Sequence, residues 1–449
     1  MNARHKRRSP LRIILTVFLI AALIAGGAYG GWVWYDNNID RSGWVEEAGS
    51  TLYKDFHGKY VTGWQEIDGS PYYFSPEGFR ASGWQTIGGD TYYFGSDGIM
   101  VTLWQEIDGA PHFFGSDGKL HSGWLTWEGN RYYLESGTPR TGWQNLDGFR
   151  HYFAEDGTLC SGWQEIDGDV YYLSPDGIPL IGSVKLESGS YYFGKDGILH
   201  TGWLDTDRGR TYYRGDGTQA FGWAEIEGKR YHFAEDGIMQ TGWYQEGEYS
   251  YYLQEDGSAA VGPTQIEGNT HYFSPGGIHV VLVNALNPVP SYYKMNLVTV
   301  TGWHQVSDVC LDALVQMLAD CNAAGISYTF NSAHRTIAEQ TTILEMRTQE
   351  YMDTGMEFGP ARAKALQTVA IPGTSEHHLG LAVDLLGDKA VAWFNEHCWD
   401  YGFIVRYTAE KSQITGIANE PWHFRYVGKE VALELKDSGL CLEEYLGAA

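Results

Sequence analysis

The sequence has few cysteines and few cations, and these two shortages exclude two classes of protein. With 5 Cys in 449 residues, the chain is not a disulfide-rich scaffold. Its 31 Lys and Arg face 56 Asp and Glu, and the net charge of −25 disfavours nonspecific binding to nucleic acid, which depends on neutralising phosphates. Apolar residues still make up 43% and aromatic residues 15% of the chain, so we expect folded cores and not an acidic disordered chain.

The cysteines support no particular bridge. Cys160 stands alone, while Cys310, Cys321, Cys398 and Cys441 lie near the C-terminus. At a separation of 11 residues Cys310 and Cys321 would share one face of a helix, and the distance of about 16 Å along its axis is too long for a disulfide. Other pairings stay open if the compartment is oxidising, and none of the cysteines is spaced as a zinc site.

An uncharged segment near the N-terminus is long enough to cross a bilayer. Residues 13–35 carry no charge, and the basic segment 1–12 precedes them. This order predicts a signal anchor with a cytoplasmic N-terminus, and the aromatic residues within 32–35 resemble an interfacial belt. The alternative is a cleaved signal peptide with its cleavage site among the small residues 21–28. Both alternatives place the rest of the chain outside the cytoplasm.

Residues 36–281 form twelve units of about 20 residues that repeat one phrase. Most units begin with Gly-Trp, and the others have Leu103-Trp104, Gly182-Ser183 or Gly262-Pro263 in its place. A short acidic stretch, a turn such as Asp68-Gly69, an aromatic pair and usually a second Asp-Gly follow. The pattern predicts two short strands per unit, and because a lone hairpin is marginal in water, we expect the hairpins to stack in a solenoid. Glycine falls from 41 residues in 36–281 to 12 in 282–449, which indicates a domain boundary near residue 280.

These units resemble the cell-wall-binding or choline-binding repeats of Gram-positive surface proteins. In the choline-binding version a second Trp precedes the Tyr pair and contributes to a cation–π cage. Here that position holds other residues, such as Pro71, Thr91 and Arg131, so the units look closer to the glucan-binding and clostridial-toxin variants. With 15 basic and 36 acidic residues, the array fits a neutral glycan or a cationic teichoic-acid decoration better than an anionic polymer.

The tryptophans of the array have two interpretations. They bind glycan, or they form the core of the solenoid, as we expect for many of them. The candidate glycan-binding residues are Trp64, Trp84, Trp104, Trp124, Trp163, Trp203, Trp223 and Trp243.

Residues 282–449 change to a mixed pattern of helix and strand. Apolar positions predict an amphipathic helix over 311–324, followed by a strand over 326–330 and a second helix over 337–352. The predicted fold class is therefore multidomain, with an N-terminal membrane helix, a β-hairpin solenoid and a C-terminal α+β domain.

Two segments of the C-terminal region combine histidine with acidic residues. A catalytic zinc ion needs three nitrogen or oxygen ligands, one open position, and a nearby carboxylate to accept the proton of water. His377, Asp384 and His423 can supply the ligands, and Glu420 can supply the carboxylate. Spacing alone does not single out this chemistry, because most histidines are not ligands.

The order of residues in these segments is more specific than their spacing. Ser-x-His-x-x-Gly-x-Ala-x-Asp from Ser375, followed by Glu-Pro-Trp-His at 420–423, resembles the VanY family of zinc D-alanyl-D-alanine carboxypeptidases. Segments 401–407 and 442–446 match as well, so the resemblance covers nearly all of 282–449. It implies an α+β zinc peptidase domain with one zinc ion per chain.

The resemblance also implies roles for individual residues. Zinc would lie on His377, Asp384 and His423, with Glu420 as general base. Arg335 would stabilise the oxyanion or hold the terminal carboxylate of the substrate. Ser332, Gln340 and Ser375 would contact the substrate.

Other histidines receive structural interpretations. His378 follows His377, and neighbours on an extended segment point to opposite faces, so both cannot bind one metal. His304, His334 and His397 are expected to be surface or core residues.

The implied activity is removal of the C-terminal D-alanine from peptidoglycan stem peptides at the outer face of a Gram-positive-type membrane or in the cell wall. The alternatives are an L,D-carboxypeptidase, a peptidoglycan endopeptidase, or a catalytically inactive wall-binding surface protein. Because all catalytic motifs follow residue 330, binding and catalysis are predicted to be separable, with residues 282–449 active alone.

Overall fold

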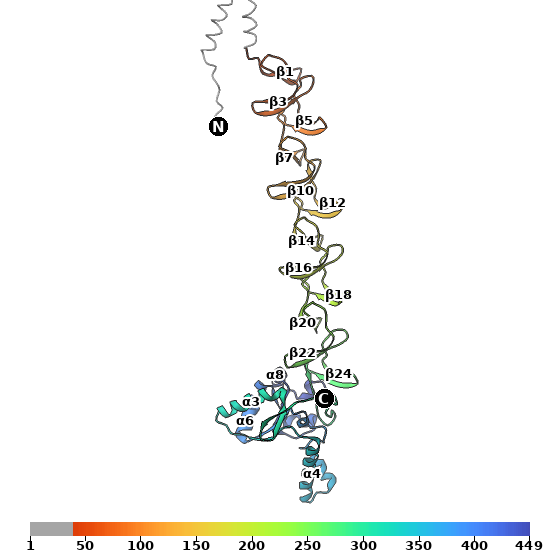
Figure 1. Cartoon of the computed structure of the whole chain (residues 1–449), viewed down its shortest axis with the longest axis vertical. Helices are drawn as coiled ribbons and strands as arrows, with labels where there is room; N and C mark the ends of the chain where they lie inside the picture. The colour runs from red at the N-terminus through yellow and green to blue at the C-terminus, as the bar shows by residue number, and fades with distance from the viewer. Residues whose placement is uncertain (1–38) are drawn as a thin grey trace, which may run out of the picture. The chain divides into compact units, whose positions relative to one another are not determined.

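The structure is a computed structural model, and it describes residues 39–449 (Figure 1). The predicted anchor at 13–35 and the basic segment before it lie outside the described residues. Within 39–449, no helix is long and apolar enough to cross a membrane.

Contacts group the described chain into two compact units. The first unit contains residues 39–184 and 192–199, and the second contains 185–191 and 200–449. The second unit therefore includes the last repeats together with the C-terminal domain, whereas the change in sequence pattern lies near residue 280.

Each predicted repeat forms one antiparallel hairpin of two short strands, as Figure 1 shows. The strand pairs are β1 (Gly43–Glu47) with β2 (Ser50–Lys54), β3 (Gly63–Ile67) with β4 (Ser70–Phe74), β5 (Gly83–Ile87) with β6 (Asp90–Phe94), β7 (Leu103–Ile107) with β8 (Ala110–Phe114), β9 (Gly123–Trp127) with β10 (Asn130–Glu135), β12 (Gly142–Leu146) with β13 (Phe149–Phe153), β14 (Gly162–Ile166) with β15 (Asp169–Leu173), β16 (Gly182–Leu186) with β17 (Gly189–Phe193), β18 (Gly202–Thr206) with β19 (Gly209–Tyr213), β20 (Gly222–Ile226) with β21 (Lys229–Phe233), β22 (Gly242–Glu246) with β23 (Tyr249–Leu253), and β24 (Gly262–Ile266) with β25 (Asn269–Phe273). Short strands β11 (Thr138–Pro139) and β26 (His279–Val280) extend the β9–β10 and β24–β25 pairs.

The turn of each hairpin follows from its sequence. In β3–β4, Ile67 pairs with Ser70, which leaves Asp68 and Gly69 as the two-residue loop. Their φ angles are 52° and 79°, and positive φ at both positions is the type I′ turn that matches the twist of paired strands. The predicted Asp-Gly turn is therefore present.

Aromatic side chains join each hairpin to the next. The Trp64 ring centroid lies 5.3 Å from that of Tyr73 in its own hairpin and 5.0 Å from that of Tyr92 in the following one. The backbone N–H of Arg80 also donates to the carbonyl of Thr51 in the preceding hairpin, at 2.8 Å. The most deeply buried aromatic residues of the array are Phe74, Phe94, Phe114, Phe153, Phe193, Phe233 and Phe273. Stacking therefore buries what one hairpin alone cannot.

The C-terminal domain contains helices, short 3-10 segments and two further sheets. Its elements are β27 (Leu297–Thr301), β28 (His304–Ser307), α3 (Asp308–Ala323), β29 (Thr329–Ser332), α4 (Ile337–Asp353), α5 (Phe358–Ala365), η1 (Glu376–Leu379), β30 (Ala382–Leu386), α6 (Asp388–His397), η2 (Cys398–Tyr401), β31 (Phe403–Tyr407), η3 (Ala409–Lys411), α7 (Ser412–Thr415), β32 (Glu420–Tyr426), α8 (Lys429–Ser438) and α9 (Leu442–Tyr445). The predicted strand over 326–330 occurs later, as β29, and the first helix begins earlier, at Asp308.

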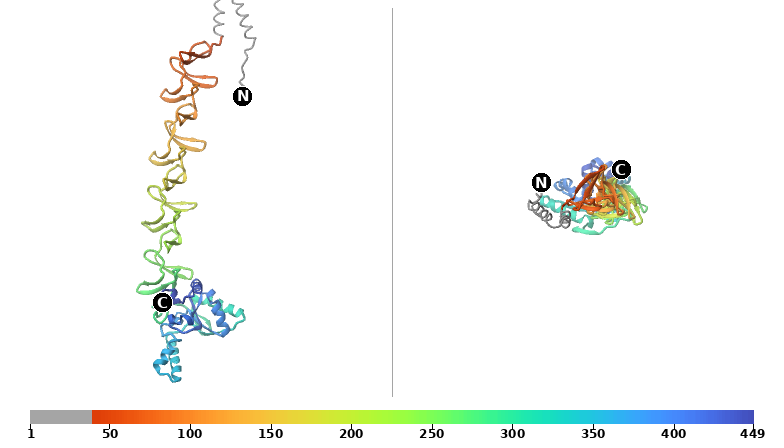
Figure 2. Two further views of the ribbon diagram at one scale, coloured as in Figure 1. Left: turned by 180° about the vertical axis from the view of Figure 1, so that it is seen from behind. Right: turned by 90° about the horizontal axis from the view of Figure 1, so that it is seen from above.

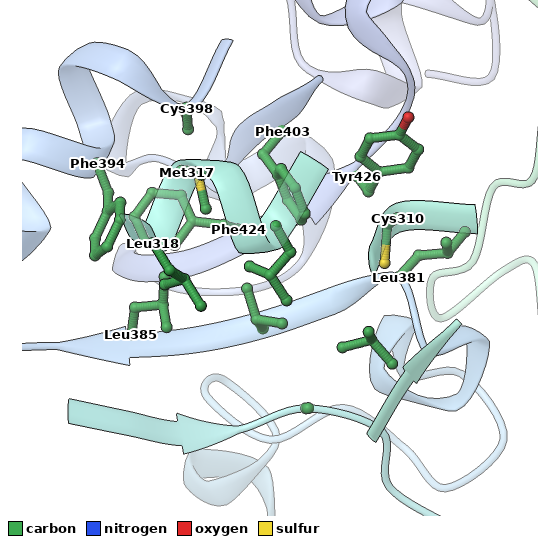
Figure 3. Close-up of a cluster of buried hydrophobic side chains, with 14 of the residues drawn as sticks. Cys310, Met317, Leu318, Leu381, Leu385, Phe394, Cys398, Phe403, Phe424 and Tyr426 are labelled. Atoms are coloured by element: carbon green, nitrogen blue, oxygen red, sulfur yellow. The ribbon is translucent and has the colours of Figure 1, made fainter. Parts of the chain in front are cut away.

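A four-stranded antiparallel sheet in the order β29-β30-β32-β31 organises this domain. Helix α3 buries one stripe against it, including Leu314, Met317 and Leu318. In Figure 3, Met317 and Leu318 gather with Phe424 and Leu385 from the sheet strands. Cys310, Cys321 and Cys398 lie in the same core, and all five cysteines are free thiols.

The last repeats share a hydrophobic cluster with the C-terminal domain. Tyr251 and Ile278 from the repeats pack in one cluster with Val431 and Leu446. Tyr426 also donates a hydrogen bond to Glu248 at 2.5 Å. The chain ends beside these hairpins, as Figures 1 and 2 show. Residues 282–449 alone would therefore expose part of their own core, which argues against the predicted independence of this segment.

Candidate active site

The sheet brings the predicted metal ligands together. Asp384 on β30 and His423 on β32 are direct partners in the antiparallel register. His377 lies on η1, one short turn before β30. One ligand atom from each of the three side chains lies within 4.8 Å of the others, and all three side chains are buried. The structure thus forms a compact donor set from two histidines and one carboxylate.

Glu420 reaches the same place because strand β32 is irregular. Residues three apart on a regular strand point to opposite faces, which would separate Glu420 from His423. The register with β31 shifts between Val405 and Tyr407, so that Tyr407 pairs with Glu420. The Glu420 Oε2 atom then lies 3.9 Å from His423 Nδ1. Bulges of this kind often redirect side chains beside active sites.

Hydrogen bonds fix the orientation of both histidines. His377 Nδ1 lies 2.6 Å from the carbonyl of Ala333, so Nδ1–H donates there and Nε2 faces Asp384 Oδ2 at 3.4 Å. His423 presents Nδ1 to Asp384 Oδ1 at 3.1 Å and Nε2 to Glu376 Oε2 at 3.6 Å. One nitrogen of each ring is thereby directed toward Asp384, as metal-binding histidines require.

Glu376 is a functional candidate that the sequence analysis missed. Its carboxylate accepts hydrogen bonds from Arg406 at 2.9 Å and Arg425 at 2.8 Å, and Arg406 in turn binds Glu443. Burial raises the pKa of Glu376, but the two arginines outweigh burial and hold the pKa well below its usual range. A buried anion therefore faces Nε2 of His423, and the only sequence signal was its position beside His377.

Arg335 is held next to the donor set. Helix α4 begins with a capping box between Thr336 and Glu339, which ends the preceding segment at Arg335. The guanidinium donates to Asp384 Oδ2 at 2.6 Å and to Ser332 Oγ at 2.7 Å. Gln340 donates to the carbonyl of Ala370 at 2.9 Å and lies beside the guanidinium.

A cavity of about 580 Å³ opens onto these residues. Its lining includes all eight residues predicted for catalysis, metal binding and substrate contact, together with Arg347, Tyr351, Tyr407 and Trp422. Ser332, Gln340 and Ser375 are thus placed where a substrate can reach the cavity wall, although Gln340 and Ser375 are themselves almost fully buried.

Burial and neighbouring charged groups set the pKa values of the site residues. It raises the pKa of Glu420 to about 7, and the neighbouring Asp384 adds to this shift while His423 opposes it. Burial also lowers the pKa of His377 to about 4. For His423, burial lowers the pKa, but the neighbouring carboxylates of Asp384 and Glu376 outweigh burial and raise it to about 9.

His378 faces away from the donor set. The segment 376–379 is a 3-10 turn, not the extended segment that the sequence argument assumed. The Nδ1–H of His378 donates to the carbonyl of Arg335 at 2.7 Å, and the Nε2 of His378 accepts from the N–H of Gly373 at 3.1 Å. His378 therefore tethers the Arg335 loop. His304, His334 and His397 are likewise not part of the candidate donor set.

The candidate glycan-binding tryptophans occupy equivalent places on their hairpins. Each contacts the aromatic pair of its own hairpin, as Trp84 contacts Tyr93 at 5.1 Å. Several rings also remain accessible, and Trp64, Trp84, Trp163 and Trp243 are 40–49% exposed. The side chains are therefore part of the stack and part of the surface.

Comparison with known proteins identifies both regions. Residues 303–429 match the sequence model of VanY, described as D-alanyl-D-alanine carboxypeptidase. Residues 81–102, 140–178 and 220–262 match a choline-binding repeat, and residues 62–78 match a cell wall binding repeat.

Individual relatives cover the C-terminal region or the array. A D-alanyl-D-alanine carboxypeptidase of Enterococcus faecalis is 40% identical over an alignment of 175 residues that covers 37% of this chain and 65% of that protein. The solved structure of the D,D-pentapeptidase VanY from a VanB-type cassette, in complex with Zn(II), is 39% identical and covers 37% of this chain and 97% of its own, with a TM-score of 0.36. The structure of CbpJ from Streptococcus pneumoniae is 28% identical over 53% of this chain and 100% of its own, with a TM-score of 0.41.

A buried pair of histidines and an aspartate, beside a glutamate at a cavity wall, is the donor set of metal-dependent hydrolases. The C-terminal domain belongs to the VanY family of D-alanyl-D-alanine carboxypeptidases, and the preceding array consists of choline-binding-type cell wall repeats. The chain spans 40% to 65% of the length of the curated relatives it matches.

Proposed function

We propose that this protein is a zinc-dependent carboxypeptidase that removes the C-terminal D-alanine from peptidoglycan stem peptides. The observation that carries the proposal is the placement of His377, Asp384 and His423 within 4.8 Å of one another, with Glu420 beside them in the cavity of a VanY-family domain. The names of the sequence relatives support D-alanyl-D-alanine as the bond that is cut.

The residues present fit a zinc ion. Two imidazoles and a carboxylate are a frequent catalytic donor set, and the Nε2 of His423 and the Oε2 of Glu376 are buried without a hydrogen-bond partner. A proton on that Nε2 would face Glu376 and leave Nδ1 as the ligand atom. When bound, zinc would supply Lewis-acid polarisation of the scissile carbonyl and lower the pKa of water.

Glu420 is the proposed general base. With a pKa raised by burial to about 7, its carboxyl group is matched to accept a proton from water at neutral pH and to return it to the departing amine. The amide bond breaks as the water oxygen bonds to its carbonyl carbon, and the products are free D-alanine and a stem shortened by one residue.

Arg335 is the proposed anchor for negative charge. Its guanidinium is already directed at the cavity by Ser332 and stabilised on Asp384, so it can hold the terminal carboxylate or the oxyanion without a large rearrangement. Ser332, Gln340 and Ser375 would contact the substrate from the same wall. Glu376 is the proposed positioning residue for His423.

The array is proposed to hold the enzyme at the wall. We assign residues 36–281 to a binding array with candidate glycan contacts at the tryptophans, and 282–449 to the peptidase domain. Residues 13–35 are proposed as a membrane anchor with 1–12 in the cytoplasm, which would place the enzyme on the outer face of a Gram-positive-type membrane or in its wall. The acidic array favours a cationic wall decoration as ligand.

Chromatography of purified muropeptides with mass detection tests the reaction. Incubation with the protein should shorten stems that end in D-alanyl-D-alanine by one alanine and release free D-alanine. A chelator should stop the reaction and zinc should restore it, while the Glu420→Gln protein serves as the inactive control. A product cut within the stem would indicate an endopeptidase, and unchanged muropeptides would contradict the proposal.

A further inference from the structure

Four arginines of the array lie over tryptophan rings of their own hairpins. The guanidinium carbon stands 3.6–4.6 Å from the ring centroid in each pair. The pairs are Arg131 on Trp124, Arg150 on Trp143, Arg210 on Trp203 and Arg230 on Trp223. At such distances a cation is attracted by the negative face of the indole.

The hairpin register produces these pairs. Arg131 stands opposite Thr126, two residues after Trp124 on the facing strand, so Arg131 and Trp124 share one face of the hairpin. The other three pairs have the same offset in β12–β13, β18–β19 and β20–β21. The contact therefore recurs in each hairpin that has arginine at this position of the repeat.

Hydrogen bonds hold two of the guanidinium groups in place: Arg131 donates to Asp176 at 2.7 Å, and Arg230 donates to the carbonyl of Gly276. Arg210 lies 3.3 Å from Asp205, but its Nε makes no hydrogen bond. Fixing the far side of Arg131 and Arg230 limits the movement that would uncover their rings.

Most hairpins with another residue at this position leave the tryptophan more exposed, although Trp104, in the hairpin with Pro111, is half-buried. Pro71, Thr91 and Ser250 occupy this position in the hairpins of Trp64, Trp84 and Trp243, and those three rings are 40–49% exposed. The four rings beneath arginines are all half-buried. The array therefore contains tryptophan faces with and without an arginine in contact, and one position of the repeat decides which kind a hairpin has.

We propose that Arg131, Arg150, Arg210 and Arg230 act as built-in ligands that close their tryptophan faces, so that a cationic wall group binds only at hairpins without this arginine. The arginines indicate which class of ligand the open tryptophans would bind. A guanidinium of the protein already occupies the place on the ring that an external organic cation would take. A second cation there would meet both a covered ring and a like charge. The proposal rests on the proposed wall-binding role of the array.

Equilibrium dialysis of the full chain with choline as the probe tests this proposal. The four arginines are changed to Thr, the residue at position 91, together and also singly as Arg131→Thr and Arg210→Thr. Arg140→Thr and Arg208→Thr are matched controls, because these arginines pair with Glu135 and Asp236. We expect the fourfold variant to bind up to four more choline molecules per chain than the unchanged protein, each single variant about one more, and the controls no more.

The outcomes separate the proposal from the function on which it rests. If only the arginine variants bind choline, the arginines do close the rings, but the unchanged array is not a binder of cations. If the unchanged protein binds choline and the variants bind no more, the array role stands and the closing role is overturned. Absence of binding in every protein would overturn both. The single variants keep the test valid if the fourfold variant does not fold.

Discussion

The repeats of the first unit and the C-terminal domain are stabilised by different kinds of contact. A repeat such as that of Trp64 contacts the hairpin next to it, and the same contact recurs along the array. The C-terminal domain instead joins residues far apart in sequence, as Arg425 does with Glu376 and with the carbonyl of Val281. Contacts in the array are therefore repeated at equivalent positions, whereas the cavity residues of the domain depend on one convergence of strands.

The last repeats make both kinds of contact. They keep the hairpin pattern, yet Tyr251 and Ile278 pack in one cluster with Val431 and Leu446. A repeat pattern in sequence therefore does not mark the limit of a folding unit, and substitutions in the two regions should have different consequences.

The largest effect is expected from Glu420→Gln. Glutamine keeps the size of the side chain but cannot accept a proton from water, so kcat should fall by roughly 10²–10⁴-fold. Bound zinc and sedimentation with cell walls should stay unchanged, because neither ligand atoms nor array residues are altered. Turnover and wall binding are measured on the same preparation. A near-normal kcat would remove Glu420 from the base role.

A pair of matched tyrosines tests the shared cluster. Tyr251 and Tyr171 occupy the same repeat position and are 4% and 5% exposed, but only Tyr251 packs with the C-terminal domain. Truncation of a buried aromatic residue costs about 3 kcal/mol. Tyr251→Ala should therefore shift the calorimetric transition that accompanies loss of activity, and Tyr171→Ala should not. Equal effects of the two changes on activity would argue against a shared cluster.

Acid should weaken this same junction. Burial lowers the pKa of His279 to about 4, and the ring lies 5.1 Å from that of His271. The unfolded chain, with a histidine pKa of about 6.5, binds the proton first, so stability falls as pH decreases from about 6.5 to 4. We expect a loss of about 2 kcal/mol in calorimetry over this range, and a smaller loss in His279→Gln. An unchanged pH dependence in that variant would assign the loss to other groups.

The smallest effect concerns salt. If cation–π contacts on tryptophan faces supply most of the wall affinity, retention of the Glu420→Gln protein on purified walls should change by less than about threefold between 50 and 500 mM salt. Loss of retention at high salt would instead indicate ion pairing by the acidic surface of the array.

Parts of this molecule were predictable because local sequence determines them. The Asp68-Gly69 turn and the spacing of Trp64 follow from backbone preferences and a fixed period, and the structure contains the hairpins. Family motifs also selected His377 over His378, although the extended segment assumed for that argument is a 3-10 turn.

Other parts depend on contacts that no local pattern contains. Glu376 becomes a buried partner of His423 only because Arg406 and Arg425 arrive from two later strands. Glu420 reaches the donor set through a register shift in β32. The contact of Arg131 with Trp124 depends on how two strands pair, because the two residues lie diagonally across the hairpin. The packing of Tyr251 against the C-terminal domain depends on the tertiary fold.

Elemental analysis of the purified full chain tests whether His377, Asp384 and His423 form a zinc centre. We expect one zinc per chain in the unchanged protein and in Glu420→Gln, because the latter keeps all three ligands. His423→Ala should fall below one zinc per chain and lose activity. Full zinc occupancy in His423→Ala would contradict the assignment.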